Sequence, residues 1–148
     1  MNPLQAKRIV VIEDDQDYLD MLKIRLNING FDVFTASEAL KGLGLIRSMK
    51  PDLVILDLRL PGMCATDAED VDRHMGQKIC RMIKFDAKLR HIPVLMLTCS
   101  DSADDIEQSI KSGADSYLMK TASTEFLIHE VRRMLGLKRH QMADAAAV

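Results

Sequence analysis

The chain has 148 residues and a mass of 16.6 kDa, which predicts one compact domain large enough to bury an apolar core. Its 20 basic and 22 acidic side chains give a net charge of −2, so we expect no direct nucleic-acid partner and no membrane partner. No apolar run exceeds four residues, far below the roughly 20 that cross a bilayer. A polar start and three cysteines without metal-site spacing favour a cytoplasmic location.

Short apolar runs alternate with longer segments of helical period, which is the pattern of a parallel sheet covered by helices. A first strand is expected at residues 8–12, and Asp15 is placed to cap a helix that Asn29 and Gly30 end. A second strand at residues 31–35 precedes a helix over residues 37–49. Gly42 and Gly44 weaken that helix by about 1 kcal/mol each relative to alanine.

The third expected strand, residues 52–57, contains an apolar run without alternation, which is typical of a strand covered on both faces. A third helix is expected to end near residue 86. The remaining strands and helices are expected at residues 92–98, 102–112, 115–119 and 123–135. We expect residues 1–6 to be an N-terminal extension, residues 7–137 to be the domain and residues 138–148 to be a tail or the start of a linker.

Polar side chains end four of the five expected strands. Glu13 and Asp14 follow the first, Asp57 closes the third, and Thr98 and Lys120 close the last two. Because ligands of parallel sheets bind beyond the carboxyl ends of the strands, we expect these groups to meet at one edge. Capping or surface exposure could explain most of them singly. Asp57 follows four apolar residues, where an unpartnered carboxylate would be costly.

Three carboxylates this close cannot all stay ionised without a cation. Ligand atoms that are all oxygen favour a hard ion, and a site that keeps several waters suits Mg²⁺ better than Ca²⁺. With lysine and threonine opposite the metal, the arrangement is suited to binding a phosphoryl group that Asp57 attacks in line.

Four ordered motifs resemble the receiver domain of bacterial two-component response regulators. They are IVVIEDD at 9–15, PDLVILDLRLPGM at 51–63, PVLMLT at 93–98 and GADSYLMK at 113–120. The resemblance covers residues 7–137. It implies a single-domain flavodoxin-like α/β fold of five strand–helix repeats, with a parallel sheet in the order 2-1-3-4-5.

The resemblance also implies roles for residues at the site. Asp57 would accept a phosphoryl group from a histidine kinase or histidine phosphotransfer protein. Glu13, Asp14, Asp57 and the backbone carbonyl of Arg59 would hold Mg²⁺ as the cofactor. Lys120 would pair with the phosphoryl oxygens.

Thr98 would donate a hydrogen bond to the phosphoryl group, and Tyr117 would then turn inward as the second part of a switch. The switch would change the surface of the fourth helix, fifth strand and fifth helix, which would control an output protein or domain and could form a homodimer. Apart from transfer to itself and slow autodephosphorylation, the resemblance implies no enzyme activity.

The chain departs from the family pattern at two places. Thr121 follows Lys120 where the family usually has a cis proline, so we expect a strained cis bond or, in preference, a trans loop that moves Lys120 slightly. An acidic insertion, residues 64–75, separates the third strand from Gly76. It is interpreted as extra helical turns fused to the third helix, serving as a flap over Asp57 or simply as a solvated loop.

Other functions fit the residues less well. A phosphorylation-independent receiver that only binds partners is the main alternative. A small-molecule phosphatase would have a second acid where Arg59 stands, and a nucleotide binder would need small residues in place of the acids at 13–17. Zinc binding by Cys64, His74 and Cys80 lacks a fourth ligand. Cations such as Arg132 near the end of the last helix are favoured by its dipole.

Overall fold

The computed structural model of the chain describes residues 5–60, 75–99 and 102–137. In this part of the chain, strands and helices alternate in sequence. The strands are β1 (Arg8–Ile12), β2 (Asp32–Ala36), β3 (Leu53–Asp57), β4 (Val94–Thr98) and β5 (Ser116–Met119). The helices are α1 (Gln16–Ile28), α2 (Ala39–Met49), α3 (Met75–Phe85), α4 (Ala103–Lys111) and α5 (Thr124–Met134). Each bound lies within two residues of the one that the sequence predicted.

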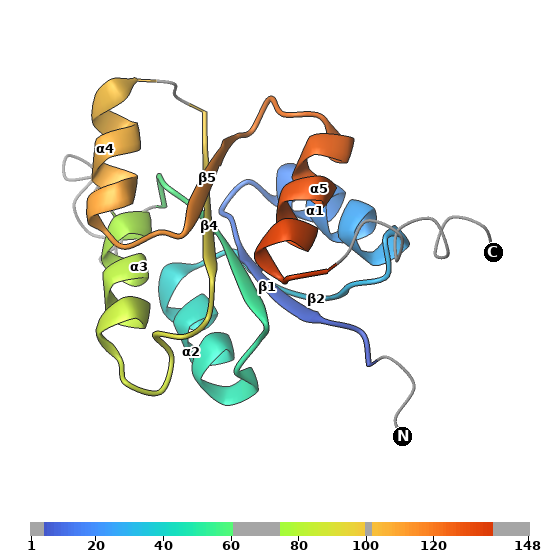
Figure 1. Ribbon diagram of the computed structural model, residues 1–148, viewed down its shortest axis with the longest axis horizontal. Helices are drawn as coiled ribbons and strands as arrows, with labels where there is room; N and C mark the ends of the chain where they lie inside the picture. Colours follow the sequence, from blue (N-terminus) through green and yellow to red (C-terminus); the bar gives the residue numbers. More distant parts are fainter. Residues whose placement is uncertain (1–4, 61–74, 100–101, 138–148) are drawn as a thin grey trace.

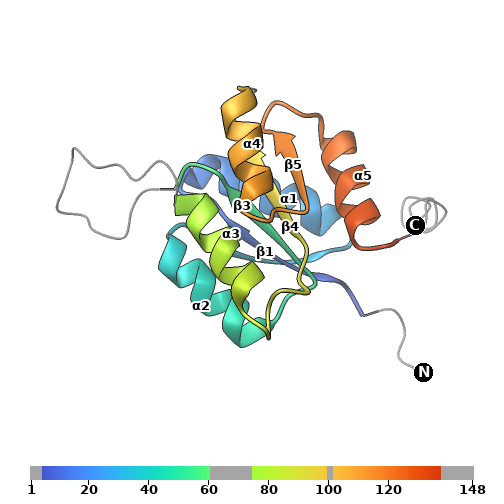
Figure 2. The same ribbon diagram turned by 60° about the vertical axis from the view of Figure 1, so that its left-hand side comes forward.

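The five strands form one parallel sheet in the order β2-β1-β3-β4-β5. Helices α1 and α5 cover one face, and α2, α3 and α4 lie on the other (Figure 1). The turned view in Figure 2 shows the same two layers. Every residue of β3 and β4 is buried, which confirms the expectation that the central strands are covered on both faces. The predicted flavodoxin-like fold and strand order are therefore confirmed.

Alternate residues of each strand point to opposite faces and build two apolar cores. On β1, Val10 and Ile12 pack against α2 and α3, whereas Ile9 and Val11 pack against α1 and α5. The sheet is thus held from both sides, which fixes the positions at which the strands end.

Three helices begin directly after a side chain that caps them, and for the first of these helices the sequence predicts the cap, Asp15. Asp15, Ser102 and Ser123 each accept a backbone hydrogen bond from the residue three positions later, at 3.2 Å. Gly30 follows the last turn of α1 with φ +91°, a conformation that glycine adopts without strain. Helix α2 starts two residues later than expected, after Glu38, which makes no side-chain capping bond.

Several expectations fall on residues outside the described ranges. These are most of the N-terminal extension (1–6), the tail (138–148), and residues 64–74 of the insertion with Cys64 and His74. Met75, the last residue of the expected insertion, is the first residue of α3, and the helix continues through Gly76. The domain boundaries stay predictions. Among the described helices, none combines the length and apolar character that a bilayer crossing needs.

The two glycines of α2 make a test of the packing between α2 and the sheet. A Cβ on Gly42 would lie 2.3 Å from Ile12 Cδ1 and 3.1 Å from its Cγ2, whereas a Cβ on Gly44 would meet nothing within 4 Å. We expect Gly42→Ala to lower the free energy of unfolding by about 1–3 kcal/mol through overpacking. Gly44→Ala should raise it by about 0.5–1 kcal/mol through helix propensity. Urea unfolding of both variants checks this, and a stabilised Gly42→Ala would contradict it.

Candidate functional site

Three acidic side chains meet at the carboxyl edge of the sheet. β1 and β3 are neighbours with Ile12 paired to Leu56, so Glu13 and Asp57 leave the sheet side by side. Glu13, Asp14 and Asp57 each offer a carboxylate oxygen within 4.8 Å of the others. Glu13 is 1% exposed and Asp57 4%, whereas Asp14 faces solvent. The predicted acidic cluster therefore forms, with two members buried.

Lys120 supplies the positive charge of the site from the far side of β4. Its backbone N–H donates to the carbonyl of Thr98 at 2.8 Å, which fixes the end of β5 against β4. The Lys120 ammonium lies 2.7 Å from Glu13 Oε2 and 3.3 Å from Asp57 Oδ2. Among the described residues no peptide bond is cis, so the bond from Lys120 to Thr121 is trans. The preferred expectation of a trans loop is confirmed, and this loop brings the lysine to the acids.

Burial and charge set the protonation of the site. Burial raises the pKa of Asp57 to about 7 from 3.8, and the charge of Glu13 adds to the rise, although Lys120 and the backbone N–H of Arg59 oppose it. Burial acts to lower the pKa of Lys120, but the hydrogen bonding and charges of Glu13 and Asp57 outweigh it and raise the pKa. The lysine therefore stays charged while Asp57 lies close to its titration point at neutral pH.

The backbone around Asp57 is tightly constrained. Asp57 Oδ1 accepts a hydrogen bond from the N–H of Arg59 at 3.2 Å, and the N–H of Leu58 donates to Leu97 at 2.9 Å. Gly76, in the first turn of α3, lies so close that a Cβ there would be 2.1 Å from the Asp57 carbonyl oxygen. Glycine is therefore required where α3 meets the end of β3. The sequence shows that this glycine comes late after β3, but it does not predict this contact.

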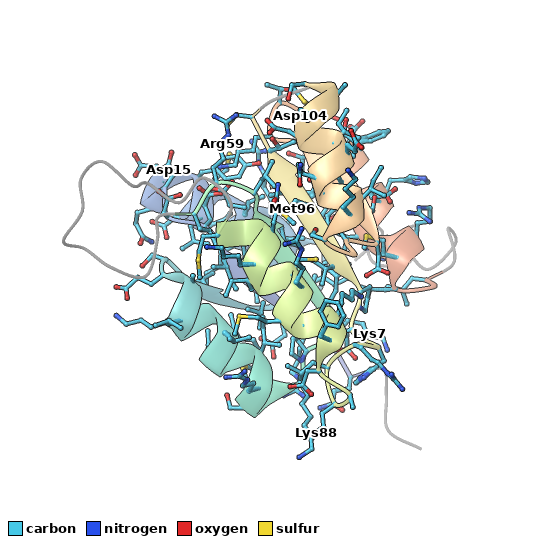
Figure 3. All side chains as sticks on the ribbon, turned by 90° about the vertical axis from the view of Figure 1, so that its left-hand side faces the viewer. Lys7, Asp15, Arg59, Lys88, Met96 and Asp104 are labelled. Carbon is cyan, nitrogen blue, oxygen red and sulfur yellow. The ribbon has the colours of Figure 1, made fainter. Side chains whose placement is uncertain are left out.

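Arg59 connects the loop after Asp57 to α4. Its guanidinium pairs with Asp105 at 3.1 Å, in the first turn of α4. Figure 3 shows Asp15, Arg59 and Asp104 at one end of the sheet and Lys7 and Lys88 toward the other. The side chain of Arg59 thus binds the first turn of α4. The role of its backbone carbonyl as a metal ligand stays a prediction.

The two residues of the predicted switch lie on neighbouring strands. Thr98 ends β4 and is 1% exposed. Tyr117 in β5 pairs with Met96 of β4, and its half-buried side chain packs against the core beneath α2 and α3. The structure thus places Thr98 at the carboxyl end of β4 and Tyr117 on the adjoining strand, and their switching role stays a prediction.

The sequence did not predict the contacts of two residues at or behind the site. Tyr18, in the first turn of α1, lies beneath the Lys120 ammonium, with 5.0 Å between Nζ and the ring centroid. The available signal was its place in the first turn of the helix that follows Asp15, directly after the acids. Arg132 was read as a cation favoured by the dipole of α5, but it is buried and donates to the carbonyl of Asn29 at 3.1 Å. Arg132 thus lies in the last turn of α5, as expected, and also binds the end of α1.

The acidic cluster fits a hard divalent cation. Glu13 Oε2 is buried, and the partner that the described residues provide for it is the Lys120 ammonium at 2.7 Å. A buried oxygen of this kind, beside two further carboxylates, has a free lone pair for a metal. Because the donors are all oxygens, Mg²⁺ suits the cluster.

The raised pKa of Asp57 predicts how its neutralisation changes stability with pH. Between about pH 4 and 7 the folded state binds more protons than the unfolded state, so stability falls as pH rises through this window and then levels off. Without metal, we expect Asp57→Asn to raise the free energy of unfolding by roughly 1–4 kcal/mol at pH 8, and far less at pH 4. Urea titrations at both pH values measure this.

Asp20→Asn is the matched control for that experiment, because Asp20 is an exposed carboxylate of α1 away from the cluster. It should change stability little at either pH. An Asp57→Asn variant no more stable than the wild type at pH 8 would show that the buried carboxylate carries no electrostatic cost.

Comparison with known proteins places the chain in a family. The family model described as the response regulator receiver domain matches residues 9–132. The chain is 32% identical over 142 residues to the DNA-binding response regulator MtrA of Mycolicibacterium paratuberculosis, covering 96% of this chain and 57% of MtrA. It is 38% identical over 128 residues to the DNA-binding dual master transcriptional regulator RpaA of Synechocystis sp., covering 86% of this chain and 48% of RpaA.

A solved structure agrees with this placement. The CheY-like response regulator receiver domain protein of Methanospirillum hungatei superposes with a TM-score of 0.74 and 28% identity, over 89% of this chain and 95% of that one. The chain matches nearly the whole length of that domain. It spans about half the length of the curated relatives MtrA and RpaA.

The names of these relatives correct one expectation. The near-neutral charge predicted no direct nucleic-acid partner, but MtrA and RpaA are both named as DNA-binding proteins. The prediction was wrong because the composition of this chain describes only the part of those proteins that it matches. The exclusion of nucleic acid is therefore withdrawn.

The matched family model covers most of the chain, and its span includes the acidic cluster, Thr98 and Lys120. The chain belongs to the receiver domain family of response regulators.

Proposed function

We propose that the chain is a phosphoacceptor of two-component signalling that takes a phosphoryl group onto Asp57 from a histidine kinase or a histidine phosphotransfer protein. The observation that carries the proposal is the buried Asp57 carboxylate set between Glu13 and the Lys120 ammonium at the carboxyl edge of the sheet. We propose a cytoplasmic site of action, where such donors are found together with magnesium.

In the proposed transfer, an Asp57 carboxylate oxygen forms a new bond to phosphorus while the bond from phosphorus to the donor imidazole nitrogen breaks. The freed imidazole then takes a proton from water. Glu13, Asp14, Asp57 and the carbonyl of Arg59 would hold Mg²⁺, which when bound supplies positive charge for the phosphoryl oxygens. Asp57 must be ionised to attack, and its pKa of about 7 makes the nearby Lys120 charge important for that ionisation.

Lys120 and Thr98 would then hold the transferred group. The ammonium lies 3.3 Å from Asp57 Oδ2, close enough to bind an oxygen of a phosphoryl group carried by that carboxylate. Thr98, at the end of the strand beside β3, would donate its hydroxyl. Tyr117 on the adjoining strand would follow the movement of Thr98.

The output would be a changed surface of α4, β5 and α5 that controls a partner protein or domain. The ion pair between Arg59 and Asp105 supports this, because it joins the loop that follows Asp57 to the first turn of α4. The names of MtrA and RpaA favour a DNA-binding output for this surface to control.

A general phosphatase activity fits the site poorly. The second residue after Asp57 is Arg59, whose guanidinium is paired with Asp105, so no second acid stands there to protonate a leaving group. We therefore propose transfer to Asp57 itself and slow autodephosphorylation as the only chemistry.

A receiver that binds partners without phosphorylation is the second candidate. It is favoured by the position of the Lys120 ammonium, which lies closer to Glu13 than to Asp57. A lysine held by Glu13 alone would leave Asp57 protonated at neutral pH.

Acetyl phosphate with Mg²⁺ separates the two candidates. We expect intact-protein mass spectrometry to show a gain of one phosphoryl group in the wild type and in Asp20→Asn, and no gain in Asp57→Asn. The reason is that Asp57 is the carboxylate on which we propose that the phosphoryl group is carried, next to the acidic cluster and the Lys120 ammonium, whereas Asp20 is exposed and outside that cluster. A wild type that takes up no phosphoryl group at saturating Mg²⁺ supports the second candidate. A gain that persists in Asp57→Asn would place the acceptor elsewhere.

A further inference from the structure

We propose that the ring of Tyr18 is the positioning element for Lys120, holding its ammonium between Glu13 and Asp57. The proposal rests on the function proposed above, and it adds a residue that neither the motifs nor the comparisons assign to the site. Tyr18 would act through Lys120 and would not itself contact the phosphoryl group.

Two contacts join Tyr18 to Lys120. The ammonium lies over the ring at 5.0 Å from its centroid, within the range of a cation–π interaction. The Tyr18 hydroxyl donates to the backbone carbonyl of Lys120 at 3.5 Å, so the same side chain contacts both ends of the lysine. Burial raises the pKa of Tyr18, although the charge of Lys120 opposes the rise, so the hydroxyl remains a donor.

The position of Tyr18 on α1 makes this contact rigid. Asp15 caps α1 by accepting the Tyr18 N–H at 3.2 Å, and the cap follows directly after Glu13 and Asp14. The acids and the ring are therefore presented by one continuous segment. Lys120 follows the edge strand β5, two strands beyond β3, and lies 102 residues after Tyr18 in the chain.

Lys120 needs such support because the hydrogen bond to Thr98 fixes its backbone but leaves its long side chain able to rotate. The bond to Thr121 is trans, and threonine does not fix φ as a proline would. The lysine side chain is a flexible stem with several rotatable bonds. Three groups restrain its ammonium: Glu13 after β1, Asp57 at the end of β3, and the ring on α1.

The distances from the Lys120 ammonium to the two buried acids explain why the ring affects Asp57. The ammonium is 0.6 Å farther from Asp57 than from Glu13, by the distances of 3.3 and 2.7 Å, so the acids alone favour Glu13. The exposed Asp14 carboxylate offers a further position toward solvent. A ring beneath the ammonium removes freedom from the lysine and keeps it within reach of both buried acids.

The test compares Tyr18→Phe, which keeps the ring, with Tyr18→Leu, which removes it, in the full chain. Phe85→Leu is the matched aromatic-to-leucine control, because Phe85 is 86% exposed on α3. The initial rate of phosphorylation by acetyl phosphate is measured at saturating Mg²⁺, together with the Kd for Mg²⁺. Both Tyr18 variants are repeated in a Lys120→Met background.

We expect Tyr18→Leu to lower the phosphorylation rate about tenfold, the size of a partly desolvated cation–π contact. Tyr18→Phe and Phe85→Leu should stay within about twofold of the wild type, and the Kd for Mg²⁺ should be unchanged in all of them. With Lys120→Met present, Tyr18→Leu should cause no further loss. An unchanged rate in Tyr18→Leu, an equal loss in Tyr18→Phe, or a loss that persists without Lys120 each overturns the proposal.

A second measurement does not depend on phosphorylation. The ring should shift the proton signals of the Lys120 ε-methylene upfield in nuclear magnetic resonance spectra of the wild type and Tyr18→Phe, but not of Tyr18→Leu. If the wild type takes up no phosphoryl group, the proposed function fails while this shift still tests the contact. Lys120 signals unchanged between the wild type and Tyr18→Leu overturn the contact even if phosphorylation is normal.

Discussion

The structure depends on a buried pair of carboxylates that share one ammonium. Glu13 and Asp57 are almost completely buried, and at this depth two negative charges destabilise the folded chain unless a cation joins them. Lys120 balances one of the two charges, and a divalent metal would balance the rest. The repulsion between these buried carboxylates lowers the stability of the folded chain. Such an arrangement is typical of residues that serve function rather than stability.

The parallel sheet makes this cluster possible. In the order β2-β1-β3-β4-β5, β1 and β3 are adjacent and β4 separates them from β5. Glu13 and Asp57 thus lie side by side, whereas Lys120 must reach across the end of β4 past Thr98. Because both faces of the sheet are packed against helices, these strand ends have little freedom. The apolar cores are thus what keeps the charged groups within ion-pair distance.

Much of this arrangement could be predicted from local signals. Apolar runs predicted the strands, and the cap at Asp15 predicted the start of the first helix, because these features depend on near neighbours in sequence. Contacts between distant segments left no such signal. Arg132 reads as an ordinary cation near a helix end, yet it lies over the ring of Phe31 at 5.4 Å and binds the end of α1. The net charge of the chain led to the wrong prediction that nucleic acid is no partner, because this charge describes only the part of the longer relatives that this chain matches.

The close packing of Gly76 explains how a receiver can carry extra residues after β3 and keep its site. Leu60 is buried on one side of the additional segment, and Gly76 lies against the Asp57 carbonyl on the other. Both anchors are set by the core, since Met75, Ile79 and Ile83 of α3 are buried in the same cluster as β3. The described residues on either side of residues 61–74 are therefore held in place by the packing of β3 and α3. The backbone of Asp57 is thus held by the core on one side and by Gly76 of α3 on the other.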